Sequence, residues 1–212
     1  MEADPPALPS SSAIGNLEMA RANSQITLDR LASDNRELAS SDSEAEELIE
    51  SCTDLFHWLA GHPSLADQRS DDAIFNASFD LGDVLRRYEV KPDAVRKLLA
   101  AIRDLFARYF AETSAGLSCQ QMWDNLIGYA EWADAPASGQ LFVEESRAIL
   151  ADLLNQAEPH VRSSAIHGLN HYPDMEAAAG LLQDHLPKED DPAVRAYCGQ
   201  VLQAFGRDER MI

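Results

Sequence analysis

A short helical sequence occurs twice near the C-terminus, and this repeat constrains the fold more than any other feature. EPHVRSSAIHGL begins at Glu158 and DPAVRAYCGQVL at Asp191, so that Pro, Val, Arg and Leu recur 33 residues apart. Proline suits the first position of a helix, because its fixed φ matches the helix and its missing N–H would have no partner there. Pro159 and Pro192 therefore predict two helix starts.

Each copy carries one narrow apolar face. At about 100° per residue, four side chains of each copy fall within an arc of ~40°. They are Val161, Ala165, Leu169 and Tyr172 in the first copy, and Val194, Cys198, Leu202 and Phe205 in the second. A helix with a single apolar face must pack against another helix, and a second helix between copies predicts stacked helix pairs.

The two copies resemble the second helix of HEAT-like repeats, whose signature is Asp-Pro-x-Val-Arg followed by Ala and Leu at four-residue steps. The similarity is to the short bacterial variety first associated with phycobilin lyases, and it covers residues 140–206. It implies an α-solenoid of antiparallel helix pairs. It also implies that Arg162 and Arg195 each pair with an acid of the adjoining repeat and are structural. PDAVRKLLAAI, from Pro92, suggests a third copy.

Helical periodicity continues through most of the chain, and no segment alternates as a strand does. The pattern predicts an all-α protein with a flexible arm over residues 1–23, an irregular helical region over 24–134 and HEAT-like repeats over 135–212. We expect the last two regions to form one domain. The predicted helices cover residues 24–40, 43–61, 92–110, 118–132, 141–156 and 175–186, besides the two repeat helices.

Two segments leave the helix boundaries open. Residues 71–90 fit either one helix broken near Gly82 or a short helix followed by a loop. Residues 134–139, DAPASG, have the composition of a turn.

The charge balance limits the classes of partner. The chain of 212 residues has 36 acidic and 17 basic residues, a net charge of −19. Such a surface repels phosphate backbones and anionic lipids, so we expect neither nucleic-acid nor membrane binding. It attracts a basic protein, although a high charge also serves solubility alone. The first 15 residues have no basic region followed by an apolar core, which favours a cytoplasmic protein over a secreted one.

Three cysteines, Cys52, Cys119 and Cys198, lie far apart and form no CxxC pair. Their spacing favours buried thiols in a reducing compartment over disulfides or a thiolate metal site.

A polar stripe on the first repeat helix is the candidate binding surface. His160, His167 and His171 fall within ~40° of one another, beside Ser164 and far from the apolar face. The HEAT resemblance implies that the stripe lines a concave groove, with Tyr197 and Gln200 at equivalent positions of the second copy. Tyr197 can instead pack against the C-terminal tail, where Met211 and Ile212 could cap the last repeat.

His167 and His171 have the i, i+4 spacing of two metal ligands on one helix. No other His or Cys is placed by sequence to complete a site, and no histidine is followed by the Glu of HEAT-like di-iron hydroxylases. We therefore expect no metal, no cofactor and no catalytic residue. The sequence favours a non-catalytic protein-binding module that uses His160, Ser164, His167, His171, Tyr197 and Gln200. The alternatives are a small acidic immunity-type inhibitor of a basic toxin, and a metal-dependent or lyase-type enzyme.

Overall fold

A computed structural model describes residues 39–65, 68–113, 116–128 and 132–208. The predicted arm over residues 1–23, most of the predicted helix over 24–40, and Met211 and Ile212 lie outside these ranges. Within them the protein is all-helical and contains no strand, which confirms the predicted class. None of the described helices combines the length and the apolar character needed to cross a membrane.

Eight α-helices, α2–α9, account for most of the described residues. Two of them continue directly into π-helical segments, α4 into η2 and α5 into η3, and two short 3₁₀ turns (Pro63–Leu65 and Leu186–Lys188) follow α2 and α8. The bounds are α2 Asp42–Gly61, α3 Gln68–Arg87, α4 Pro92–Asp104, η2 Leu105–Phe110, α5 Gly116–Trp123, η3 Asp124–Gly128, α6 Ala137–Leu153, α7 Pro159–Asn170, α8 Met175–His185 and α9 Pro192–Asp208.

The start of α2 follows from local chemistry. The Glu44 amide donates to the Ser41 hydroxyl at 3.3 Å, and the Glu44 carboxylate accepts from the amide and the hydroxyl of Ser40, both at 2.7 Å. These bonds satisfy amides that have no partner inside the helix. The negative charge at Asp42 and Glu44 also complements the helix dipole.

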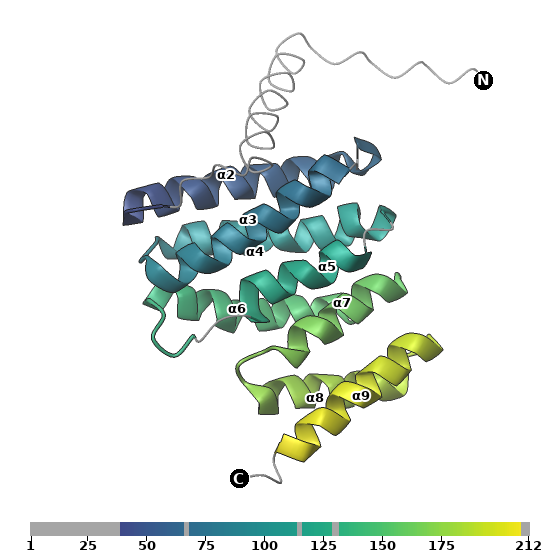
Figure 1. Cartoon of the computed structure of the whole chain (residues 1–212). Helices are drawn as coiled ribbons and strands as arrows, with labels where there is room; N and C mark the ends of the chain where they lie inside the picture. Colours follow the sequence, from purple (N-terminus) through teal and green to yellow (C-terminus); the bar gives the residue numbers. More distant parts are fainter. Residues whose placement is uncertain (1–38, 66–67, 114–115, 129–131, 209–212) are drawn as a thin grey trace, which may run out of the picture.

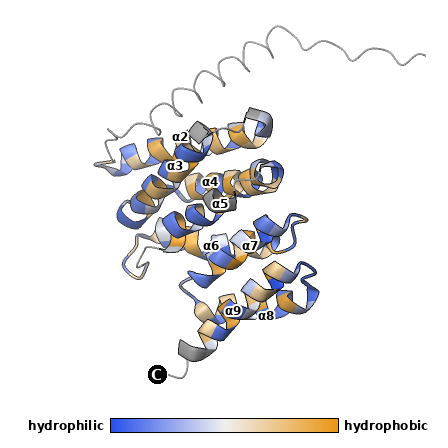
Figure 2. Cartoon of the chain, turned by 45° about the vertical axis from the view of Figure 1, so that its right-hand side comes forward, coloured by the Kyte–Doolittle hydropathy of each residue, from blue (hydrophilic) through white to orange (hydrophobic). Residues whose placement is uncertain are grey.

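The helices pack in two series (Figure 1). In one, α2 contacts α4 and α4 contacts α6; in the other, α3 contacts α5, α5 contacts α7 and α7 contacts α9. Helices that follow each other in the chain, such as α2 and α3, α6 and α7, or α8 and α9, also contact one another. The core lies where these elements meet, and every labelled helix carries both polar and apolar residues (Figure 2).

The repeat helices begin where the sequence predicts. α7 starts at Pro159 and α9 at Pro192, and the two helices are in contact. All predicted apolar-face residues are buried except Leu202, which is partly buried against the core. The copy at Pro92 differs, because α4 packs between α2 and α6 rather than in the series that holds α7 and α9. Helices that begin with a proline thus occur in both series.

α3 runs without a break through Gly82, so both predicted alternatives, a helix broken near Gly82 and a short helix followed by a loop, are wrong. A Cβ at this position would lie 2.2 Å from the backbone oxygen of Asn125. Gly82 therefore allows α3 to approach η3 closely. The Asn125 amide completes this contact by donating to the Phe75 carbonyl at 3.1 Å and to the Ser78 hydroxyl at 2.9 Å.

The predicted turn over 134–139 is too long, because α6 already begins at Ala137. Gly139 lies in the first turn of α6, where a Cβ would be 2.2 Å from the Leu85 carbonyl oxygen. The small residues that suggested a turn instead permit a close contact between α6 and the end of α3.

Arg162 and Glu189 form a buried ion pair between α7 and the segment that precedes α9. The Arg162 guanidinium donates to both Glu189 oxygens, at 2.8 and 2.7 Å, and to the Gln156 and Ala157 carbonyls. Glu189 also accepts from His185 Nε2 at 2.8 Å. Arg195 donates to the Glu189 carbonyl oxygen. Arg162 thus pairs with an acid beyond its own helix, as expected, whereas the bond of Arg195 is to a backbone carbonyl just before its own helix and is not the expected pairing with an acid of an adjoining repeat.

All three cysteines are buried, as expected. Burial raises the pKa of the Cys119 thiol far above its usual range, and it raises that of Cys198 to about 11. Both thiols are therefore held in the neutral form, which is a poor nucleophile.

Candidate functional site

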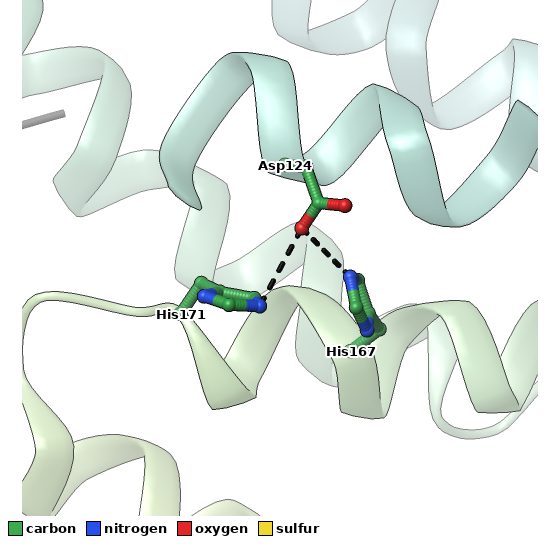
Figure 3. Close-up of side chains that lie close together, drawn as sticks. All are labelled: Asp124, His167 and His171. Atoms are coloured by element: carbon green, nitrogen blue, oxygen red, sulfur yellow. Dashed lines mark hydrogen bonds and ion pairs between the residues drawn. The ribbon is translucent and has the colours of Figure 1, made fainter. Parts of the chain in front are cut away.

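Three side chains from two elements converge at the contact between η3 and α7 (Figure 3). Asp124 Oδ1 lies 2.7 Å from His167 Nε2 and 3.4 Å from His171 Nε2. The two imidazole rings meet edge to face, with their centroids 5.0 Å apart. One oxygen and two nitrogens, each able to bind a metal, thus lie within 4.8 Å of one another.

Local structure places each of the three. Asp124 is the first residue of the π-helical segment η3, and such segments are frequent at functional sites because the wider turn redirects side chains. His167 and His171 are four residues apart at the end of α7, so both rings lie on the side of α7 that faces η3. Gly128 lets the His171 ring approach, since a Cβ there would lie 3.3 Å from His171 Cγ and 3.4 Å from Asp124 Oδ1.

Tyr197 extends the cluster to α9. Its hydroxyl lies 2.9 Å from His167 Nδ1. An ionised Asp124 only accepts hydrogen bonds, so His167 Nε2 carries the proton that it donates to Asp124. In neutral His167 the other nitrogen, Nδ1, then accepts from the Tyr197 hydroxyl. The cluster is a hydrogen-bonded chain from α9 through α7 to η3.

The cluster is partly open to solvent. The exposed fractions of the side chains are 36% for His171 and 19% for both His167 and Asp124. Burial and the neighbouring His167 ring lower the pKa of His171, against the opposing effect of Asp124. Burial, followed by the charge of Asp124, raises the pKa of Tyr197. His171 is thus biased toward the neutral imidazole, the form that binds a metal ion.

The rest of the predicted stripe contacts neighbouring elements. His160 is half-buried and its Nε2 donates to the Phe110 carbonyl at 2.6 Å, while Ser164 is fully buried and donates to the Cys119 carbonyl at 3.0 Å. This stripe does not line an open groove over its whole length, because η2, α5 and η3 lie against it. The Ser164 hydroxyl in particular is not available to a partner.

Three of the six predicted residues meet, and three do not join them. His167, His171 and Tyr197 belong to the cluster. His160 and Ser164 lie closer to the start of α7, and Gln200 is exposed on α9. Tyr197 bonds to His167 rather than standing free in a groove.

Asp124 is the residue that sequence reasoning missed. It lies 43 residues before His167, within MWDNLI, where its neighbours Met122, Trp123 and Leu126 are buried. A carboxylate inside an apolar stretch was the available signal. The spacing alone could not tell that η3 would meet α7.

The comparisons with known protein families, curated proteins and solved structures give no match to this chain. The candidate site therefore rests on its own geometry.

Proposed function

We propose that this chain is a non-catalytic protein-binding module built as a HEAT-like α-solenoid. Three observations support the proposal: the two series of packed helices, the proline-initiated repeat helices α7 and α9, and the buried Arg162–Glu189 pair between successive helix pairs. Stacked helix pairs offer long surfaces made of many similar helices, and such surfaces are used to bind other proteins.

An exposed aromatic pair on α3 carries this proposal. Phe75 and Phe79 are 41% and 48% exposed, the only aromatic side chains among the large exposed hydrophobic residues in the described part of the chain. They lie four residues apart, on the same side of the helix. Asp72 is exposed on that side as well, one turn before them. Neighbouring exposed aromatic residues on a soluble protein commonly mark a surface that a partner covers.

The charge of the chain indicates the chemistry of this partner. With a net charge of −19, the module attracts segments rich in Lys and Arg and repels acidic ones. A partner that suits Phe75 and Phe79 presents apolar side chains flanked by basic residues. The apolar part provides the buried area, while the basic part orients the partner and speeds association.

The same series of helices offers further polar contacts beyond α3. His171 and Gln200 are exposed, and Tyr197 is half-buried between α7 and α9. In this proposal they form the second part of the surface, without His160 and Ser164, whose polar atoms bond to neighbouring backbone.

The test is affinity purification of the full chain from its native cells, followed by a binding titration with the purified partner. We expect the double substitution Phe75→Ser with Phe79→Ser to weaken binding at least tenfold. The matched control is Met175→Ser, which removes another exposed hydrophobic side chain, 44% exposed at the start of α8. Gln200→Trp tests the second part of the surface. Unchanged binding in both the double variant and Gln200→Trp would refute the proposal.

The charge also favours a second candidate, an immunity-type inhibitor of a basic toxin or enzyme. In that case the purified partner has an activity that stoichiometric amounts of this chain abolish. Its association rate falls steeply as salt rises, because screening weakens the long-range attraction. A partner without an inhibitable activity would remove this candidate and leave the binding module.

A further inference from the structure

The Asp124, His167 and His171 cluster has the ligand set of a mononuclear metal centre. We propose that it binds one divalent transition-metal ion, with zinc as the reference ion, and leaves a coordination position open to solvent. The metal site shares His171 and Tyr197 with the second part of the proposed binding surface. It is nevertheless tested separately, because a metal titration needs no protein partner and does not involve Phe75 and Phe79.

The distances already approach those of a coordinated ion. Zinc binds His nitrogen and carboxylate oxygen at about 2.0–2.2 Å, which in a tetrahedron separates the ligand atoms by about 3.4 Å. Asp124 Oδ1 and His171 Nε2 are 3.4 Å apart. The 2.7 Å distance from Asp124 Oδ1 to His167 Nε2 has to widen by about 0.7 Å when a metal ion replaces the shared proton.

The donor types decide the class of ion. Two imidazoles and one carboxylate suit zinc, iron, cobalt, nickel or copper, whereas magnesium and calcium prefer oxygen ligands throughout. Three protein ligands also leave at least one position for water or an added ligand, which is the arrangement of reactive rather than purely structural sites. The partial exposure of all three side chains gives the ion a path of entry.

Tyr197 supplies the outer support that metal-binding histidines usually have. When a metal ion occupies His167 Nε2, the ring proton moves to Nδ1, which then donates to the Tyr197 oxygen instead of accepting from it. The same contact therefore holds the ring in both states. A phenol can reverse its role in this way because its oxygen both donates and accepts.

The site joins separate elements, which distinguishes it from two histidines on a helix surface. Its oxygen comes from η3 and its nitrogens from α7 and the C-cap of that helix, and Gly128 leaves space between them for the His171 ring. Binding therefore fixes the contact between η3 and α7, and ligand addition stabilises the folded state.

The experiment titrates chelator-treated full-length protein with Zn²⁺ by calorimetry and with Co²⁺ by visible absorption. We expect one ion per chain, and we expect His171→Gln, His167→Gln and Asp124→Asn each to weaken binding at least tenfold. Tyr197→Phe should weaken it about tenfold without changing the stoichiometry. The control is His57→Gln, which removes an exposed histidine 3.7 Å from Asp104, outside the cluster. An excess of Mg²⁺ occupies the acidic surface and excludes non-specific binding.

Three results would overturn the proposal: no stoichiometric binding of Zn²⁺ or Co²⁺ in the presence of Mg²⁺, affinity unchanged in His171→Gln, or equal losses in His57→Gln and His171→Gln. His171 is the most exposed of the ligands, so its substitution keeps the test valid even where Asp124→Asn fails to fold. Added azide should change the Co²⁺ spectrum, and an unchanged spectrum would exclude the open position.

Discussion

Replacing Glu189 by Gln should destabilise the protein by about 3 kcal/mol at neutral pH. The Glu189 side chain is completely buried and the Arg162 side chain is 9% exposed, so the substitution removes the buried partner of a nearly buried charge and leaves Arg162 paired with the 93% exposed Asp190 at 3.2 Å. The amide also places an N–H group where the carboxylate accepted from Arg162 or His185.

Two independent arguments give this magnitude. Hydrogen bonds from Arg162 lower the pKa of Glu189 from its ordinary value near 4.5 to about 2. By linkage this difference corresponds to about 3 kcal/mol of folding free energy. Breaking one partner of a buried ion pair typically costs about 3–5 kcal/mol. The lower end applies here, because Arg162 keeps its bonds to the Gln156 and Ala157 carbonyls.

The lowered pKa of Glu189 determines how the stability difference between the two proteins changes with pH. Because folding lowers this pKa, the stabilisation by Glu189 is complete above the unfolded pKa near 4.5 and is lost as the pH falls toward 2. The difference in unfolding free energy between wild type and Glu189→Gln should therefore be constant from pH 7 to about 5 and shrink below it. Urea denaturation at a series of pH values measures this difference.

The matched control is Glu145→Gln. Glu145 also pairs with an arginine, Arg96, at 3.1 Å, but both side chains are exposed, at 37% and 53%. Exposed pairs contribute about 0–1 kcal/mol. Equal losses in the two variants, or a loss in Glu189→Gln that does not shrink in acid, would show that burial does not govern the strength of this pair.

The other predictions concern close packing, a helix cap and thiol access. Gly82→Ala should cost at least ~2 kcal/mol in urea denaturation, because its Cβ would clash with the Asn125 carbonyl, and overpacked contacts cost about 1–3 kcal/mol. Gly180→Ala, also within a helix but with open space around it, should instead stabilise the protein by about 0.5–1 kcal/mol, and a loss here would contradict the packing argument. Ser41→Ala should lower the free energy of unfolding by about 1 kcal/mol, because the N-cap of α2 is lost. The same denaturation measures this loss, and an unchanged stability would show that the cap does not stabilise the helix. The three cysteines should react with a thiol reagent only as fast as the protein opens, whereas rapid labelling in native buffer would argue against their burial.

Sequence reasoning succeeded where local chemistry decides the structure. The helices that begin at Pro92, Pro159 and Pro192 and the helix that follows Ser41 carry their start signals within a few residues. Gly82 is different, because its role depends on Asn125, a residue of another element. The π-helical segments also have no local signal in this chain.

The site was only half predictable for a related reason. Periodicity correctly placed His167 and His171 on one side of their helix, but it does not say which neighbour covers that side. The expected open groove depended on the stripe facing solvent, and the packing of α5 and η3 against α7 buries Ser164 instead. Asp124 entered the site through the same packing. Contacts between elements distant in sequence thus account for what the pattern could not supply.

The helix pair α8 and α9 is attached to the rest of the described fold mainly through α7. Local opening of this pair therefore depends on its contacts with one helix. α8 and α9 contact α7, and the Arg162–Glu189 and His167–Tyr197 contacts reinforce this attachment. Regions with few tertiary contacts open first in hydrogen exchange. The backbone amides of α8 and α9 should therefore exchange as one cooperative unit, ahead of those in α2 and α4, and at a rate set by side chains that belong to α7.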